Sequence, residues 1–494
     1  MMNTKLSYQI FDHHNPQAAW YSHDFQDHII HHPIRHMVAD NFSFIYSLFL
    51  NGRLRSGILD SIMKMLLCRT YFLGYDLFEC PVCHDQKRVP RCCHSRFCNT
   101  CGVKYSRMIA ANASAICLDV RHRHLVFTIP DCLRSWFLQD RSRLNLLFVA
   151  ARNTMHVMVS SNLYKKLKKS GRVDSFYKFK NFPSIKQFGM IAALHTFGRD
   201  LKWNPHIHAL VPELIYDPKK DQIKAFTHFH FEKLRKTFQF ELLRLIGLEC
   251  QKNGTYTQFL NTKNQLYSRY DNGFYVYARL QKALKDDTYS SKVSEDINAC
   301  IQYMLRYVGR PAMAESRIVE YDRQANCVHW FYHDHKTELR HDEWESSESF
   351  IVKLIRHIPD PNFKTIRYYG FYSNASRRTL DHVHDLLGKK NKKDYSRKKR
   401  KEKRNRNMEK LTYRNSMIDC FNKDPIKCRC GTTMEYRRTF DPVPKGEKNV
   451  RRYLDRSVNE VLSLRVPRDR SKVDLRRNVR DKPAEQLRLH LSAV

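Results

Sequence analysis

The sequence lacks the long apolar runs from which membrane-spanning helices are built. Its longest apolar run near the start, FSFIYSLFL, has about half of the ~20 residues that a spanning helix needs. No charged and then apolar signal region follows the opening MMNTKLSYQIFDHH, and the chain shows no internal repeat. A GxxxxGK[ST] phosphate-binding loop is also absent. We therefore expect neither a membrane protein nor a secreted protein, and no P-loop motor in this chain.

Acidic residues are scarce relative to basic ones. The chain has 87 Lys and Arg against 50 Asp and Glu, a formal net charge of +37. Because this surplus exceeds what solubility requires, it indicates a polyanionic partner. Nucleic acid is the first choice, since basic side chains neutralise phosphates and the 12% of aromatic residues can stack on bases. An anionic membrane is the alternative, and the short apolar runs disfavour it.

One segment concentrates this charge. Residues 389–406 contain twelve Lys and Arg against two acids, which predicts a solvated tail or linker that cannot bury a core. Such a segment can hold a DNA backbone, or it can merely keep the chain soluble.

The 15 cysteines, without a signal region, indicate a reducing compartment in which thiols stay free or bind metal. Two CxxC pairs stand fourteen residues apart, and they predict one tetrahedral zinc site that orders a short segment at 80–101. The predicted ligands are Cys80, Cys83, Cys98 and Cys101, with Cys93 as a fifth candidate and Cys92 and His94 as weaker ones. Redox chemistry is the alternative role for a single CxxC pair. Because a redox motif needs no second CxxC pair nearby, the presence of two pairs favours zinc. Further along, Cys428 and Cys430 are either half of another site or unliganded thiols.

The periodicity of the chain predicts an α+β protein. SGILDSIMKMLLCRTYFLGY has helical spacing, RHRHLVFTIP reads as a buried strand stopped by a proline, and a long helical stretch covers 140–169. GFYVYARLQ and VHWFYHD read as further strands. We expect a helical lead-in and zinc-binding region at 1–112, a catalytic domain at 113–386 and a basic, partly disordered tail at 387–494.

The stretch WNPHIHALV contains two histidines on either side of one isoleucine. In a strand, His206 and His208 point to the same face, which is a metal-ligand geometry, although two solvent-facing histidines would give the same pattern. GMIAALHTFG can pair with this strand as a hairpin in which residues whose numbers sum to about 403 face each other. That register sets His195 opposite His208 as a third metal ligand, and Gln302 is the substitute if the register slips.

The segment EDINACIQYMLRYV has apolar residues at helical spacing, and Gly309 and Pro311 predict that the helix ends at about Val308. Tyr303 and Tyr307 are four residues apart, so their rings lie on one face of this helix, about 5–6 Å apart at Cβ. Taken alone, the two tyrosines are better explained as packing residues than as nucleophiles.

Three elements in this order resemble the two-tyrosine HUH transposases of rolling-circle insertion sequences. They are the cysteine-rich CPVC…CCHSRFCNTC, then HTFGRDLKWNPHIHALV, then YMLRYVGRPAMAESRI, within a resemblance that covers about 69–372. The family often has His where this chain has Asn204, outside the metal pair. The resemblance implies an HUH core with a central antiparallel sheet and flanking helices, preceded by a transposase zinc-binding domain.

The resemblance also implies a chemistry. His206, His208 and His195 would hold Mg²⁺ or Mn²⁺ at a scissile phosphate, and Tyr303 or Tyr307 would attack single-stranded DNA to give a 5′-phosphotyrosine and a free 3′-OH. Zn²⁺ would be structural. We expect a cytoplasmic enzyme whose partners are the single-stranded ends of its element, target DNA and a host helicase. The alternatives are a plasmid replication initiator or relaxase with the same chemistry, and a non-catalytic zinc-dependent DNA-binding protein.

Overall fold

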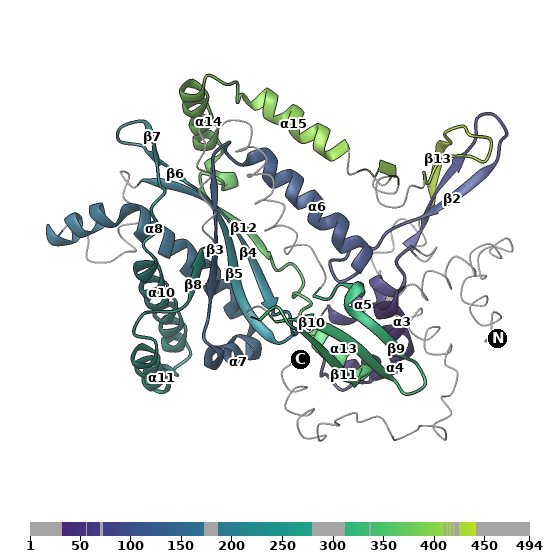
Figure 1. Cartoon of the computed structure of the whole chain (residues 1–494), viewed down its shortest axis with the longest axis horizontal. Helices are drawn as coiled ribbons and strands as arrows, with labels where there is room; N and C mark the ends of the chain where they lie inside the picture. Colours follow the sequence, from purple (N-terminus) through teal and green to yellow (C-terminus); the bar gives the residue numbers. More distant parts are fainter. Residues whose placement is uncertain are drawn as a thin grey trace.

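The structure is a computed structural model of the chain (Figure 1). It describes residues 32–55, 57–69, 73–171, 186–278, 312–334, 337–409, 412, 414–415, 418 and 424–440. The predicted helix that carries Gln302, Tyr303 and Tyr307 lies outside the described residues. Within the described part, no helix is both long enough and apolar enough to cross a bilayer.

A seven-stranded sheet forms the centre of the molecule, with the strand order β7-β6-β4-β5-β3-β8 and with β12 paired to β4. The described pairings within it are antiparallel. Its strands are β3 (His122–Thr128), β4 (Gln187–Phe197), β5 (Trp203–Pro212), β6 (Leu214–Asp217), β7 (Gln222–Ala225), β8 (Val276–Ala278) and β12 (Ile366–Gly370). The long strand β5 lies between β4 and β3, so the histidine pair of WNPHIHALV is on an interior strand.

The two faces of this sheet are covered by different helices (Figure 1). Alternate residues of β5, such as Ile207 and Val211, belong to the apolar core beneath α8 and α10. The opposite face buries Leu210 and Ala193 against α6 and α14. The helices of these two layers are α6 (Asn99–Ile116), α7 (Asp131–Gln139), α8 (Leu144–Lys169), α10 (Phe231–Lys252), α11 (Tyr256–Arg269) and α14 (Arg377–Asn391). Because side chains alternate along a strand, His206 and His208 lie on the α6 face, beyond Leu210.

A second core lies beside the sheet. The N-terminal helices pack with a three-stranded sheet of order β11-β10-β9 and with α13, around the buried Trp330 and Phe350. These elements are α3 (Pro33–Asp40), α4 (Phe42–Leu50), α5 (Ile58–Leu66), β9 (Ile318–Asp322), β10 (Cys327–His333), β11 (Arg340–Ser346) and α13 (Ser347–Ile355). Ile58, Ile62, Met65 and Leu66 are buried along one side of α5, as the helical spacing of the lead-in predicts.

A small ribbon projects from the body at the upper right of Figure 1. It consists of β1 (Tyr75–Glu79), β2 (Gln86–Pro90) and β13 (Glu435–Phe440), with β1 in the middle. The strands β1 and β13 are separated by more than 350 residues along the chain, yet they pair antiparallel, with Tyr75 opposite Phe440. The C-terminal part of the described chain therefore returns to the N-terminal cysteine-rich region.

The predicted solvated segment at 389–406 is helical in part. Residues 389–391 end α14, and α15 (Arg397–Glu409) is a helix that lies beside α6, where Arg404 donates a hydrogen bond to Asn112 at 3.2 Å. Arg400 also forms an ion pair with Asp381 on α14. The Lys and Arg residues of this segment remain exposed except Arg400, so the predicted solvation holds although part of the segment is helical. The described residues from 387 to 440 thus include the helix α15 and the strand β13, which contact other parts of the chain.

The predicted fold class is confirmed. The chain is an α+β protein in which helices cover an antiparallel sheet, after a helical N-terminal region and a cysteine-rich ribbon. RHRHLVFTIP forms β3, which ends before Pro130, and VHWFYHD lies in β10. GFYVYARLQ contributes the short strand β8 within its described part.

Candidate active site and zinc sites

Three histidines converge on the α6 face of the central sheet. His195 on β4 is paired with His206 on β5, and His208 stands two residues further along β5. Their ring centroids are 4.3 Å apart for His195 and His208, 5.4 Å for His195 and His206, and 4.8 Å for His206 and His208. One ring nitrogen of each histidine lies within 4.8 Å of the others, so the three can hold one metal ion.

The register of this hairpin differs from the predicted one by two residues. The sequence places His195 opposite His208, whereas the structure pairs it with His206, and the strands are joined by the short connection 198–202 beside a bulge between His195 and Phe197. A shift of two residues keeps every side chain on its face. His195 therefore still points to the same side as the histidine pair.

Burial keeps the His206 and His208 rings neutral. It lowers the pKa of His206 to about 4, and it lowers the pKa of His208 well below the ordinary value, with His195, His206 and His124 adding to the shift. Nδ1 of His206 lies 2.6 Å from the backbone oxygen of Asn204. Because a carbonyl oxygen can only accept, Nδ1 carries the proton and Nε2 presents its lone pair. The bond uses the backbone of Asn204, so it does not depend on the side chain at that position.

The orientation of His208 depends on a fourth histidine that sequence reasoning missed. Nε2 of His124 on β3 lies 2.8 Å from Nδ1 of His208, and the two rings stack with an interplanar angle of 7°. Nε2 of His208 then faces Nε2 of His206 at 3.0 Å. A signal for His124 was present in the HRH of RHRHLVFTIP, a second pair of alternate histidines on a predicted strand.

A cation lies beside the histidines. Burial is the largest cause of the lowered pKa of His206, and the hydrogen bond to the backbone of Asn204 raises this pKa. The charge of Arg134 on α7 lowers it further. In the described part of the chain, its Nε atom is buried and has no hydrogen-bond partner. Neutral nitrogen ligands next to a positive charge suit an anionic ligand such as a phosphate.

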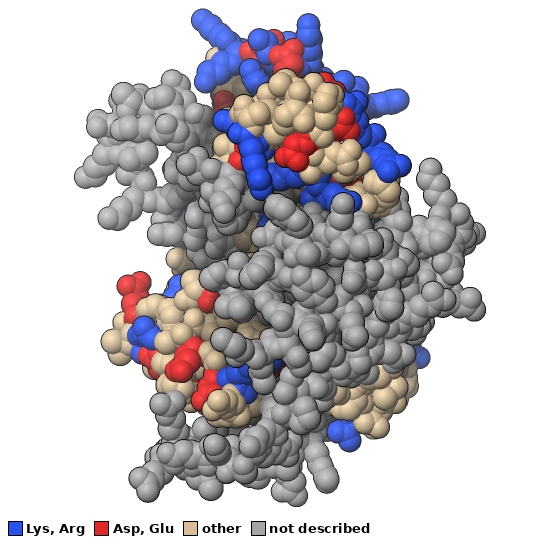
Figure 2. Space-filling view, turned by 90° about the vertical axis from the view of Figure 1, so that its right-hand side faces the viewer, with Lys and Arg blue, Asp and Glu red and all other residues tan. Residues whose placement is uncertain are grey.

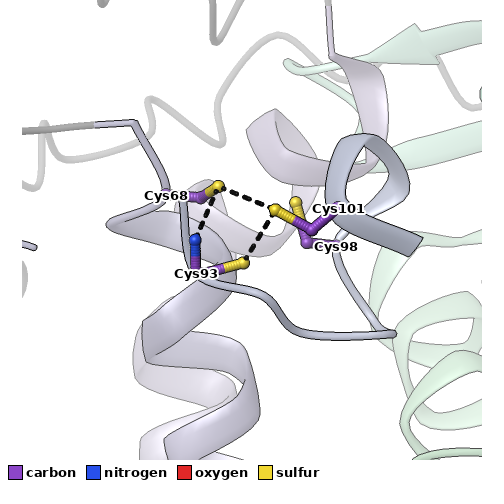
Figure 3. Close-up of side chains that lie close together, drawn as sticks. All are labelled: Cys68, Cys93, Cys98 and Cys101. Carbon is purple, nitrogen blue, oxygen red and sulfur yellow. Dashed lines mark hydrogen bonds between the residues drawn. The ribbon is translucent and has the colours of Figure 1, made fainter. Parts of the chain in front are cut away.

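The first cysteine cluster joins the end of α5 to the start of α6 (Figure 3). It consists of Cys68, Cys93, Cys98 and Cys101, whose sulfurs lie within 4.8 Å of one another. The sulfur of Cys101 is 3.5 Å from those of Cys68 and Cys93, and Cys98 and Cys101 flank the first turn of α6. Sequence reasoning missed Cys68, which stands alone in LLCRTY without a CxxC partner. The weaker candidates Cys92 and His94 are not in the cluster.

The second cluster lies at the turn of the β1–β2 hairpin and consists of Cys80, Cys83, Cys428 and Cys430. The single site predicted for the two CxxC pairs is therefore divided between two clusters. The reason is β2: its five residues, at about 3.3 Å each, place the hairpin turn roughly 17 Å from the hairpin base. Cys80 and Cys83 cannot share an ion with Cys98 and Cys101 across that length.

Comparison with known proteins covers both regions. Residues 41–129, which contain the first cluster and His124, match the family described as "Transposase zinc-binding domain". Residues 189–379, which contain the three histidines together with Tyr303 and Tyr307, match the family described as "Putative transposase".

Two curated relatives are similar over most of their length. The "Transposase for insertion sequence element IS801" of Pseudomonas savastanoi pv. phaseolicola is 27% identical over 346 residues, which cover 69% of this chain and 76% of that protein. The "Putative transposase y4qJ" of Sinorhizobium fredii (strain NBRC 101917 / NGR234) is 26% identical over 330 residues, or 65% of this chain and 76% of that protein. No solved structure matches at a comparable level. The resemblance found in the sequence is thereby supported: over these ranges the chain is similar to transposases and to a transposase zinc-binding domain.

Proposed function

We propose that this transposase nicks and rejoins single-stranded DNA at the ends of its element through a 5′-phosphotyrosine, as in rolling-circle transposition. The observation that carries the proposal is the convergence of His195, His206 and His208 on one sheet face, where burial keeps His206 and His208 neutral and the charge of Arg134 acts on His206. The tyrosines Tyr303 and Tyr307 belong to the proposal on the strength of the sequence.

The three histidines fit a catalytic divalent cation. Two nitrogens at adjacent corners of an octahedron, about 2.1 Å from an ion, are about 3.0 Å apart, and the Nε2 atoms of His206 and His208 are separated by 3.0 Å. The described cluster contains no thiol or carboxylate, so the ligand set leaves positions open for phosphate oxygens. When bound, Mg²⁺ or Mn²⁺ would polarise the scissile phosphate and stabilise the charge that develops on it.

The other steps fall to side chains of this chain. Arg134, whose charge acts on His206, would bind a phosphate oxygen of the strand. The hydroxyl oxygen of Tyr303 or Tyr307 forms a bond to phosphorus while the bond to the 3′ oxygen breaks, and that oxygen leaves as a 3′-OH. Because the phosphodiester is conserved as a phosphotyrosine, a 3′-OH can later reverse the reaction and rejoin a strand. Two tyrosines allow a second cleavage while the first remains occupied.

The structural zinc of the zinc-binding domain belongs in the first cluster. Four thiolates in tetrahedral geometry at about 2.3 Å from zinc lie about 3.8 Å apart, close to the 3.5 Å contacts that Cys101 makes with Cys68 and Cys93. The cluster ties α5 to α6, so it connects the N-terminal core to the helix that packs on the histidine face. The partner is DNA, and a host helicase would supply unwinding.

A covalent adduct on a denaturing gel tests the proposal. Single strands from the DNA that flanks the gene, labelled at the 3′ end, should become attached to the protein in the presence of Mn²⁺. We expect each of Tyr303→Phe and Tyr307→Phe to leave some adduct, and the double variant to bind the strand but form none. Tyr256→Phe, on α11, is the matched control and should behave as wild type.

The outcomes separate the alternatives. Adduct formation at the wild-type rate in the double variant would remove both tyrosines from the mechanism. Binding of every strand without adduct in any metal would identify a non-catalytic DNA-binding protein. Transposition should need both tyrosines, if one holds the first 5′ end while the other attacks the second.

A further inference from the structure

Four thiols from opposite ends of the chain meet at the tip of the projecting ribbon. Cys80 lies 3.5 Å from Cys430, and Cys83 lies 3.4 Å from Cys428 and 3.8 Å from Cys430, as measured between sulfurs. The partners in these pairs are separated by 345 to 350 residues. Such a convergence of four thiols is not accounted for by the family match, which ends at residue 129.

The spacing of the sulfurs is that of a metal site. Sulfurs about 2.3 Å from a tetrahedral zinc ion lie about 3.8 Å apart, whereas a disulfide would bring two of them to about 2.05 Å. All four cysteines are free thiols. Each pair also lies in a tight turn. The backbone N–H of His84 donates to the backbone oxygen of Cys80 at 3.1 Å, and the backbone N–H of Gly431 donates to the backbone oxygen of Cys428 at 3.0 Å. A positive φ of 91° at Gly431 permits the second turn.

The apolar packing of this ribbon is too small to hold its C-terminal strand in place. The buried residues at its tip are Cys80, Cys428 and Met434, with Phe78 packed against them. In β13, four of six residues are exposed, so the strand adds little buried apolar surface to its pairing with β1. A short sheet with so little apolar surface is marginal in water, and structural zinc commonly supplies the missing stability.

We propose that Cys80, Cys83, Cys428 and Cys430 bind a second structural zinc ion, which fastens residues 424–440 to the β1–β2 hairpin. The chain is then anchored on both sides of α15: α14 packs into the core before it, and the zinc site follows it. The transposase zinc-binding region thus includes a C-terminal part. This inference rests on thiol geometry and is independent of the proposed strand cleavage.

The proposed zinc site also lies in a part of the molecule with a basic surface. Figure 2 shows Lys and Arg gathered over the upper part of the molecule, where Figure 1 places the ribbon and α15. In α15, eight Lys and Arg stand against two Glu, and most of them are exposed. These charges lie beside α6, where Arg404 donates a hydrogen bond to Asn112.

Zinc content measured on the full-length protein tests the site. We expect about two zinc ions per wild-type chain and about one in the double variant Cys428→Ser, Cys430→Ser. The control replaces two thiols outside both clusters, Cys132→Ser and Cys327→Ser, and should keep both ions. About one ion per chain in both wild type and the double variant would overturn the proposal.

Alkylation of the wild-type protein gives a second test that does not depend on the folding of a variant. Cys83, Cys430 and Cys132 are all exposed, but only Cys132 lies outside a cluster. In zinc-loaded protein, peptide mass spectrometry should show Cys132 modified at least tenfold faster than Cys83 and Cys430. Removing zinc with a chelator should abolish this protection. Modification of Cys83 and Cys430 at the rate of Cys132 in zinc-loaded protein would exclude the site.

Discussion

Nε2 of His124 lies 2.8 Å from Nδ1 of His208, on neighbouring strands of the central sheet. If Nε2 of His208 binds a metal, its Nδ1 must carry the proton and donate it in this bond, so His124 accepts. Partners of this kind fix the tautomer and the ring orientation of a metal-bound histidine. His124 is therefore a positioning residue for the proposed metal site, although it is not itself one of the three convergent ligands.

Removing the acceptor at position 124 should weaken metal use. We expect His124→Phe to raise the Mn²⁺ concentration needed for half-maximal cleavage by about 10- to 100-fold. His124→Gln should restore much of the loss, because its amide oxygen can accept from His208. If His124 had only a structural role, His124→Gln would raise the Mn²⁺ requirement as much as His124→Phe, or more. The rate of adduct formation, measured in both variants over a series of Mn²⁺ concentrations, distinguishes the two roles.

Loss of a metal ligand should be separable from loss of DNA binding. His195→Ala should raise the Mn²⁺ requirement for cleavage at least about tenfold, while binding to a single strand without metal stays at the wild-type level. Binding is measured by fluorescence anisotropy in EDTA, and cleavage is measured across a Mn²⁺ series. An unchanged metal requirement would remove His195 from the ligand set.

The exposed lysines of α15 should contribute to DNA affinity through phosphate contacts. Replacing Lys398, Lys399 and Lys401 by Gln should flatten the dependence of log affinity on log salt by about 2, since each phosphate neutralised on a single strand contributes about 0.7. The control makes the same change at Lys219, Lys220 and Lys252, which are exposed outside α15. Equal slopes in wild type and the α15 variant would place this helix off the DNA.

Local patterns in the sequence were sufficient to predict that the three histidines lie on one face of the sheet. Alternation put His206 and His208 on one face, and hairpin pairing brought His195 to them, because an even-numbered error in register does not change faces. The hairpin connection was too irregular to fix the register itself. His124 was not predicted as a site residue, since its role depends on which strand lies beside β5.

The cysteine sites could be predicted only in part, because they too depend on which distant segments of the chain lie side by side. The CxxC spacing identified the thiols, but the partition between clusters follows from the length of β2 and from a strand contributed by residues 435–440. Nothing in local spacing indicates that Cys83 meets Cys428 across 345 residues. Likewise, composition predicted a solvated tail or linker at 389–406, and it gave no sign of the helix α15, in which Arg400 and Arg404 contact neighbouring helices.

A buried network on the α6 face of the sheet predicts an acid-sensitive fold. Nδ1 of His122 donates to the backbone oxygen of Val120 at 2.7 Å, and the hydroxyl of Tyr372 donates to Nε2 of His122 at 2.8 Å. Burial lowers the pKa of His122 from its ordinary value of 6.5 to about 4. The unfolded chain binds a proton at this residue below pH 6.5 and the folded chain does not, so stability is full above pH 6.5 and falls as the pH drops toward 4.

Between pH 7.5 and pH 5, this histidine alone should cost about 2 kcal/mol of unfolding free energy. In His122→Gln, the amide oxygen can still accept from Tyr372, but the side chain does not titrate. We therefore expect the unfolding free energy of this variant to fall by about 2 kcal/mol less than that of the wild type between pH 7.5 and pH 5. Denaturant unfolding of both proteins at the two pH values gives this difference, and effects of pH on the zinc thiolates cancel because both proteins share them. The exposed His228→Gln serves as the control and should follow the wild type. An identical pH dependence in wild type and His122→Gln would show that His122 is not held neutral in the folded protein.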